Sequence, residues 1–231
     1  MYYALATREA FRCSRIAALQ TVPKFMNYLT QPPKSADLVV IGGGILGAAS
    51  AFYASRAGLR TVIVEKRPAL CTLTTPASTG AFRAQFDNPE EIALVRESIT
   101  AFENFSDHIS IRGYDIGVRQ QGYLWLTTKS EGAARQRKIV EAQRGWGLRD
   151  VELLSGDEAR RRFPYLAPEV QSARFRQGDG WLDVKRVTMG FAQASGAEIC
   201  LDAAVTEIIT RGGRVSAVKT QRAEARANTS H

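Results

Sequence analysis

The sequence predicts an α/β fold built around a parallel sheet, and three observations lead to this prediction. A short β-branched apolar run, LVVI at residues 38–41, is followed directly by glycines. A helical stretch at residues 46–56 comes next and ends at Gly58, a typical helix-ending residue. A second buried run, TVIV, occupies residues 61–64. Strand, helix and strand within about thirty residues form a β-α-β unit, which implies parallel strands and a right-handed crossover.

A glycine motif lies between the first strand and the helix. Gly42, Gly44 and Gly47 form the pattern G-x-G-x-x-G. In this position the first glycine permits a tight turn, the second lets the backbone approach a pyrophosphate, and the third lets the helix pack closely on the strand. The N–H groups at the start of the helix, including those of Ile45 and Leu46, then face the phosphate charge together with the helix dipole. The motif predicts a Rossmann-like dinucleotide site.

Glu65 follows the second strand and narrows the choice of dinucleotide. A carboxylate in this place accepts hydrogen bonds from ribose hydroxyls and disfavours a 2′-phosphate, so NADP is not expected. The motif alone does not decide between NAD and FAD. A membrane span is the competing interpretation of the uncharged run 38–54. Its glycines would break a spanning helix and Asp37 and Arg56 bracket it, so we interpret the run as buried core.

The rest of the chain alternates between helical and strand patterns. Asn88 and Pro89 predict a helix start, because Asn is a good N-cap and Pro suits the first turn. Ser155 and Glu158 form a capping box, and the pair of glycines at 212–213 predicts a hairpin turn. We expect helices at residues 88–102, 130–144, 155–163 and 183–194, and strands at residues 122–128, 151–154, 173–177, 198–201, 205–210 and 215–219.

Composition argues against several function classes. The 231 residues carry a net charge of +8, but five basic residues and one acidic residue fall within residues 1–36. No basic stripe with interleaved aromatic residues appears, so nucleic-acid binding is not expected. The three cysteines, Cys13, Cys71 and Cys200, and the two histidines have no ligand spacing. We therefore expect no metal site and no disulfide framework, and the sparse cysteines indicate a reducing compartment.

The two ends of the chain differ from its middle. Residues 1–36 form a basic extension that we expect to be poorly ordered, and it ends in QPPKS, which cannot continue a helix. A mitochondrial transit peptide is one interpretation, and an upstream start codon or a loose tail is the other. We expect a cytoplasmic protein, with a mitochondrial location as the alternative. Residues 221–231 have no apolar periodicity and are expected to form a disordered tail.

Several separated segments resemble one family. DLVVIGGGILGAASAFYASRAGLRTVIVEK, residues 37–66, resembles the N-terminal FAD-binding signature of the D-amino-acid oxidase family of flavoproteins, which includes glycine oxidase, sarcosine oxidase and dimethylglycine dehydrogenase. STGAFRAQFDNPEEIALVRESITAF, GYLWLTT, DGWLDVKRV and GAEICLDAAVTEI resemble later parts of the same family. The R-x-Q-F run that begins at Arg83 is shared with FAD-dependent oxidoreductase domain-containing proteins. The resemblance spans residues 37–220 and narrows the expected cofactor to FAD.

The resemblance also implies roles for individual residues. The implied cofactor-binding residues are Gly42, Gly44, Ile45, Leu46, Gly47, Glu65, Lys66, Ser78, Thr79, Gly80 and Val205. Glu65 would face the adenosine ribose, and Lys66 and the backbone of Val205 would lie near the adenine. Residues 78–80 would approach the pyrophosphate and the flavin. Arg83 would sit near the isoalloxazine, where a cation stabilises the charge of reduced flavin or receives a substrate carboxylate. The alternative for Arg83 is a solvated arginine at a helix entrance.

By the same resemblance the activity would be an FAD-dependent oxidation. A hydride would pass from the carbon next to an amine to flavin N5, from a small amine or amino-acid substrate, with O₂ or another carrier as the final acceptor. Cys71 and Cys200 do not match the position that bonds the flavin covalently in some members, so non-covalent FAD is expected. Two alternatives remain open, a non-catalytic flavoprotein-like assembly factor and an NAD-dependent dehydrogenase.

The resemblance implies a domain layout as well. An FAD-binding domain would cover residues 37–116, a partial α+β substrate domain residues 117–180, and a return to the FAD-binding domain residues 181–220. Family members continue well beyond this length, and their C-terminal half completes the substrate domain. We therefore expect a partial family fold in which the activity of this chain is weak or absent.

Overall fold

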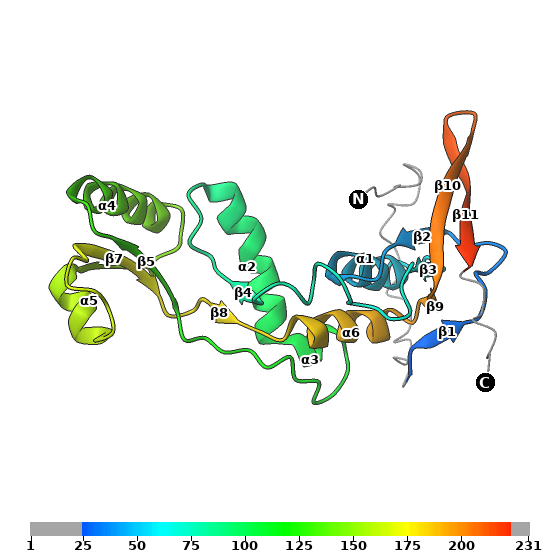
Figure 1. The fold of residues 1–231 in the computed structure, drawn as a ribbon, viewed down its shortest axis with the longest axis horizontal. Coiled ribbons are helices and arrows are strands. Elements are labelled where there is room, and N and C mark those ends of the chain that lie inside the picture. The colour runs from blue at the N-terminus through cyan, green and yellow to red at the C-terminus, as the bar shows by residue number, and fades with distance from the viewer. Residues whose placement is uncertain (1–24, 223–231) are drawn as a thin grey trace, which may run out of the picture. The chain divides into compact units, whose positions relative to one another are not determined.

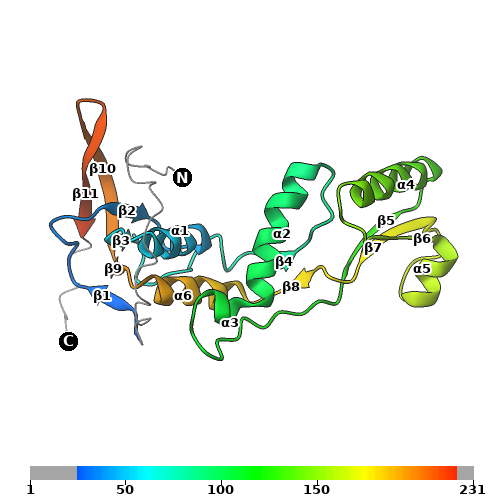
Figure 2. The same ribbon diagram turned by 180° about the vertical axis from the view of Figure 1, so that it is seen from behind.

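The computed structural model describes residues 25–222, which form two compact units (Figures 1 and 2). Within this range, unit 1 contains residues 25–78, 109–114 and 184–222, and unit 2 contains residues 79–108 and 115–183. The expected layout places residues 79–108 in the first domain, whereas the structure groups them with unit 2. Residues 81–82 of this segment pair with residues 180–181, which also belong to unit 2.

Unit 1 is built on a parallel sheet. Its strands are β2 (Leu38–Ile41), β3 (Thr61–Val64), β9 (Glu198–Cys200) and β1 (Asn27–Leu29), in the order β1-β9-β3-β2. Helix α1 (Ile45–Arg56) joins β2 to β3, which pair in parallel. Gly58 has φ +85°, a left-handed conformation that suits glycine just after a helix. The predicted β-α-β unit and the α/β fold class are therefore confirmed.

The two faces of this sheet are covered differently. Helix α1 packs against α6 (Val184–Ser195), and the ring centroids of Phe52 and Phe191 lie 5.2 Å apart. An apolar cluster of Val62, Val64, Cys200 and Ala203 forms a separate part of the core. Because side chains alternate along a strand, Ile63 points away from Val62 and Val64 to the opposite face. The cluster also contacts the base of the hairpin formed by β10 (Ala203–Arg211) and β11 (Arg214–Arg222).

Strand β1 falls within the segment that was expected to be poorly ordered. It adds to the outer edge of β9, in parallel register, with Tyr28 opposite Ile199. Its three residues have no apolar periodicity, so only the pairing with β9 identifies them as a strand. The transit-peptide interpretation depends largely on residues 1–24, and the expected tail on residues 221–231. Residues 1–24 and 223–231 lie outside the described part of the chain.

Unit 2 contains a three-stranded antiparallel sheet, β5-β7-β6. The strands are β5 (Tyr123–Thr127), β7 (Ser172–Arg176) and β6 (Glu152–Ser155), and the helices are α2 (Pro89–Glu103), α3 (Phe105–His108), α4 (Ser130–Gly145) and α5 (Gly156–Arg162). The predicted capping box is present, because the Ser155 side chain and the Glu158 side chain each bond the other residue's backbone. A short pair, β4 (Ala81–Phe82) and β8 (Gly180–Trp181), runs antiparallel.

Among residues 25–222, no helix is both long and apolar enough to cross a membrane. Residues 45–54 of the uncharged run form the first part of α1, and residues 38–41 form β2. Ala48, Ala51 and Phe52 are buried on α1, so one face of this helix belongs to the core.

Candidate cofactor site

The glycine loop after β2 is a tight turn that depends on two of its glycines. Gly42 has φ +104° and donates its N–H to the carbonyl of Val64 at 2.8 Å. Gly47, on the first turn of α1, is buried, and a Cβ added there would collide with the Gly42 carbonyl. Helix α1 can therefore approach β2 this closely only with glycine at position 47.

The N-terminus of α1 has no cap from its own N-cap residue. Gly44 is that residue, in an extended conformation with φ −82°, and it has no side chain to bond the first-turn N–H groups. Ile45 donates its N–H to Thr75 Oγ1 at 3.2 Å, and the adjacent Leu46 side chain is 54% exposed. A helix N-terminus whose N-cap is glycine fits a pyrophosphate, because N–H groups and the helix dipole both favour an anion. Thr75 was not predicted, and only its place in a Thr-rich loop could have suggested it.

Glu65, which directly follows β3, fixes the glycine loop through hydrogen bonds. Its Oε2 accepts the Gly43 N–H at 2.7 Å, and its Oε1 accepts the Arg67 N–H at 2.9 Å. Each carboxylate oxygen has two lone pairs, so each keeps one acceptor site for a ribose hydroxyl. The sequence suggested only the ribose contact, and the second role depends on a hydrogen bond that spans the β-α-β unit.

The loop that follows β3 packs against Gly43, which lies between the first two glycines of the motif. The Cys71 N–H bonds the Gly43 carbonyl at 2.9 Å, and a Cβ on Gly43 would collide with the Leu70 side chain. Cys71 is buried and has φ 56°, a left-handed conformation unusual for a residue with a side chain. A side chain at position 43, a variable position of the G-x-G-x-x-G pattern, would therefore require the Leu70 side chain to move.

The other predicted residues are divided between the two units. Lys66 is exposed beside Glu65, and Val205 on β10 packs against the apolar cluster of unit 1. Ser78, also in unit 1, donates its N–H to the Thr75 carbonyl at 3.1 Å. Thr79, Gly80 and Arg83 belong to unit 2. Unit 1 therefore contains all the predicted residues for the pyrophosphate turn, ribose and adenine, and unit 2 contains those expected on the flavin side.

Arg83 lies among aromatic rings in unit 2. Its guanidinium carbon is 4.6 Å from the ring centroid of Phe86, 5.4 Å from that of Trp125 and 5.8 Å from that of Tyr123. Its Nε is buried and has no hydrogen-bond partner among the described residues. Such cation–π contacts hold the side chain in place without neutralising its charge. The structure thus favours a fixed, half-buried cation over the alternative of a solvated arginine.

Arg83 lines a pocket of about 540 Å³ within unit 2. Its walls come from α4, from β5 and β7 and from the segment that leads into α2. The lining residues are Arg83, Gln85, Phe86, Asp87, Glu91, Trp125, Leu126, Thr127, Gly132, Arg135, Gln136, Ile139 and Arg174. Of the three arginines in the wall, Arg135 is exposed and Arg174 is buried and paired with Asp87 at 3.1 Å, so Arg83 is the half-buried cation. A carboxylate is the ligand group that suits such a guanidinium.

Comparison with known proteins identifies the family. The family model for FAD dependent oxidoreductases, named DAO, matches residues 37–229 of this chain. The chain belongs to the DAO family. The predicted family and fold class are thereby confirmed. A curated relative, FAD-dependent oxidoreductase domain-containing protein 1 from Xenopus laevis, is 30% identical over 201 residues, which cover 79% of this chain and 40% of the relative.

Two solved structures resemble the chain in fold. Glycine oxidase from Bacillus cereus ATCC 14579 is 28% identical with a TM-score of 0.68, and the match covers 80% of this chain and 51% of that structure. L-proline dehydrogenase from P. horikoshii is 26% identical with a TM-score of 0.73, covering 82% of this chain and 50% of that structure. The chain spans 40% of the length of the Xenopus relative and about half of the length of each of these structures.

Proposed function

We propose that this DAO-family chain binds FAD without a covalent bond and takes part in oxidising the carbon–nitrogen bond of a small amine or amino acid. The observation that carries the proposal is the geometry of the glycine loop. Gly47 allows α1 to touch the Gly42 carbonyl, and Gly44 at the N-cap has no side chain of its own to block the first turn of the helix. Both features favour the binding of a pyrophosphate at this turn. The names of two similar structures, glycine oxidase and L-proline dehydrogenase, support an amino-acid substrate.

The residues of unit 1 would bind the adenosine half of the cofactor. First-turn N–H groups of α1 other than that of Ile45, which donates to Thr75, would donate to the pyrophosphate. The remaining acceptor sites of Glu65 would take the ribose hydroxyls, and Lys66 and the backbone of Val205 would lie at the adenine. When bound, FAD supplies the acceptor for the substrate's hydride.

Arg83 would act at the substrate end of the site. A half-buried guanidinium that pairs with no carboxylate among residues 25–222 attracts the carboxylate of an amino acid or the negative charge of a reduced flavin. The rings of Phe86, Tyr123 and Trp125 would keep the cation oriented while the ligand enters. Residues 78–80 would approach the pyrophosphate and the flavin. O₂ or another carrier would reoxidise the cofactor.

Two buried thiols support non-covalent binding. Cys71 and Cys200 are free and buried, and burial raises the pKa of the Cys200 thiol. The thiolate is the nucleophilic form of cysteine, so a raised pKa lowers the reactivity of Cys200 at neutral pH. Both thiols lie in unit 1, where the chain would hold the adenosine half of FAD rather than its flavin ring.

Anaerobic reduction of the bound flavin tests the reaction. The purified chain would be loaded with FAD and mixed separately with glycine, L-proline and N-methylglycine while the flavin absorption band is followed. The proposal predicts loss of this band with at least one of the three compounds, at a slow rate. If FAD binds and no amine or amino acid bleaches it, a non-catalytic flavoprotein replaces the proposed oxidoreductase.

A further inference from the structure

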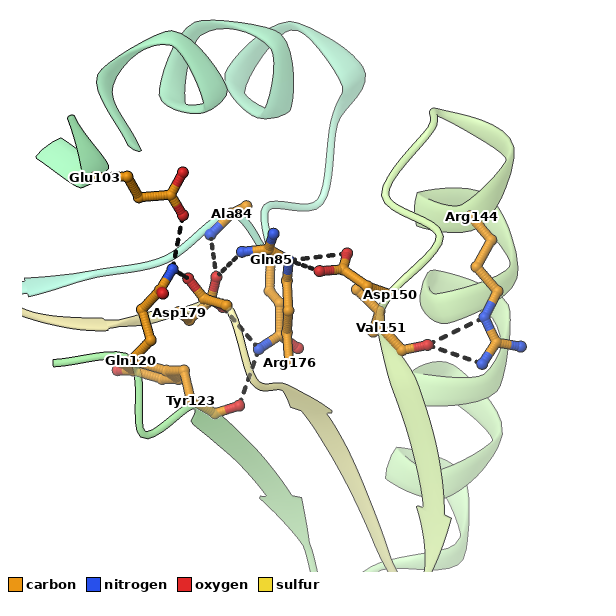
Figure 3. Close-up of polar contacts among 11 residues, drawn as sticks. Ala84, Gln85, Glu103, Gln120, Tyr123, Arg144, Asp150, Val151, Arg176 and Asp179 are labelled. Carbon is orange, nitrogen blue, oxygen red and sulfur yellow. Dashed lines mark hydrogen bonds and ion pairs between the residues drawn. The ribbon is translucent and has the colours of Figure 1, made fainter. Parts of the chain in front are cut away.

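A buried carboxylate lies behind the segment that carries Arg83. Asp179 is in the turn between β7 and β8 and is fully buried. Its Oδ1 accepts the Ala84 N–H at 2.9 Å and Arg176 Nη1 at 2.6 Å, and its Oδ2 accepts Gln85 Nε2 at 3.0 Å (Figure 3). Two of these three donors belong to the two residues that follow Arg83 in the chain.

The same segment is tied to the strand that supplies the rings around Arg83. Gln85 Nε2 donates a second hydrogen bond to the Tyr123 carbonyl at 2.9 Å (Figure 3). Both acceptors of this amide, a carboxylate and a carbonyl, can only accept, so its orientation is fixed. Tyr123 and Trp125 on β5 therefore keep a constant position relative to Arg83 as long as Asp179 holds Gln85.

Arg176 balances the charge of this carboxylate. It lies between Asp179 and Asp150, whose Oδ1 accepts from Arg176 Nε at 3.0 Å (Figure 3). Burial alone would lower the pKa of Arg176, but the hydrogen bonds to Asp150 and Asp179 outweigh it and raise that pKa. The Asp179 side of the network is fully buried, whereas Asp150 is 56% exposed. No described hydrogen bond joins Asp150 to Ala84 or Gln85, so a substitution at Asp150 is a matched control for one at Asp179.

We propose that Asp179 is a positioning residue for Arg83. Its carboxylate holds the backbone of residue 84 and the side chain of residue 85, and this fixes the direction in which the Arg83 side chain leaves the chain. Without the carboxylate, two buried donors would lose their acceptor and the segment would have to move to find another. The inference rests on the proposed role of Arg83 as the cation that receives a carboxylate.

Binding of acetate and the emission of Trp125 test this inference together. Sodium acetate would be titrated at constant ionic strength into the wild-type chain and the variants Asp179→Asn, Arg83→Gln and Asp150→Asn, with Trp125→Phe identifying the signal of Trp125. We expect Asp179→Asn to weaken acetate binding at least tenfold, and Asp150→Asn to change it less than threefold. In the double variant with Arg83→Gln, Asp179→Asn should have no further effect, because it acts through Arg83.

Trp125 emission in the absence of acetate supplies the second readout. Asp179→Asn should shift this emission in the same direction as Arg83→Gln, and Asp150→Asn should not. Gln85→Met removes one of the donors to Asp179 and should act in the same direction, which keeps the test valid if Asp179→Asn does not fold.

The outcomes separate the two proposals. Wild-type protein that binds no acetate would remove the carboxylate role of Arg83, and the Trp125 shifts would still decide the role of Asp179. A folded Asp179→Asn or Gln85→Met variant with unchanged Trp125 emission would overturn the positioning role. So would a loss of acetate affinity that is equally large with and without Arg83.

Discussion

Single residues determine the shape of the proposed cofactor turn, and each does so through a specific contact. Gly47 leaves space for the Gly42 carbonyl, and Glu65 accepts N–H groups from both sides of the β-α-β unit. The sequence predicted the glycines because their spacing follows the strand and precedes the helix. It did not predict Thr75 or the second role of Glu65, because hydrogen bonds between distant loops leave no periodic pattern in a sequence.

Replacing Gly47 with alanine should disrupt the turn. The added Cβ would collide with the Gly42 carbonyl, so α1 would have to move away from β2. We expect FAD affinity to fall at least tenfold and the free energy of unfolding to fall by about 1–3 kcal/mol, the usual cost of overpacking. Flavin fluorescence titration and urea denaturation measure the two effects. Gly145→Ala is the control, since a Cβ at position 145 meets open space; equal losses in both variants would contradict the prediction.

Replacing Glu65 with glutamine should loosen the loop without removing bulk. A glutamine has one acceptor oxygen in place of two, so either the Gly43 or the Arg67 N–H would face an NH₂ group. The free energy of unfolding should fall by about 1–2 kcal/mol, as expected for a half-buried donor left without its partner. Urea denaturation would measure this, with the exposed Glu169→Gln as control. A Glu65→Gln variant as stable as the control would mean that the two bonds contribute little.

At the scale of elements, segments with a local sequence signal were predictable, and strands that only a distant partner defines were not. The helices α1, α2, α4 and α6 appear close to their expected bounds because apolar spacing and capping residues mark them. Strands β1, β4 and β8 have two or three residues each, and only a distant partner strand makes them strands. The network around Asp179 is of the same kind, since it joins residues 84, 85 and 179 across most of unit 2.

Strands β2 and β3 are joined at their starts by an exposed ion pair that should respond to pH. Arg60 donates to Asp37 through its side chain and its backbone, and these bonds lower the pKa of the Asp37 carboxyl. A pKa that is lower in the folded state stabilises the fold above the ordinary pKa of about 3.9, and the effect is lost as pH falls through the folded value. Asp37→Asn should therefore lower the unfolding temperature at pH 7. The difference from wild type should shrink toward about pH 2, and thermal unfolding at several pH values would show whether it does.

Helix α5 depends on its capping box. Ser155 Oγ accepts the Glu158 N–H at 3.3 Å, and Glu158 Oε2 accepts the Ser155 N–H at 2.8 Å. Ser155→Ala should lower the free energy of unfolding by about 1 kcal/mol, the usual loss for an N-cap serine. Chemical denaturation followed by circular dichroism would measure it. Ser155→Asp, which keeps a cap acceptor, should retain most of the stability, and a loss as large as that of the alanine variant would argue against capping as the cause.

At the scale of the whole molecule, family membership was predictable from sequence, and the main departure from the expected layout is the segment 79–108. The motifs from residue 37 onward identified the DAO family, which the family model then matched over residues 37–229. The expected boundaries placed residues 79–108 with the first domain, whereas the structure groups them with unit 2. Strand pairing between β4 and β8, and the bonds of Ala84 and Gln85 to Asp179, are contacts that local sequence patterns do not reveal.

Equilibrium binding of FAD and NAD to the purified chain tests the central claim most directly. We expect saturable FAD binding that is weakened by Gly47→Ala, little competition from NAD, and full release of the flavin when the protein is precipitated with acid. Binding of NAD in preference to FAD, or flavin that stays with the acid-precipitated protein, would contradict it.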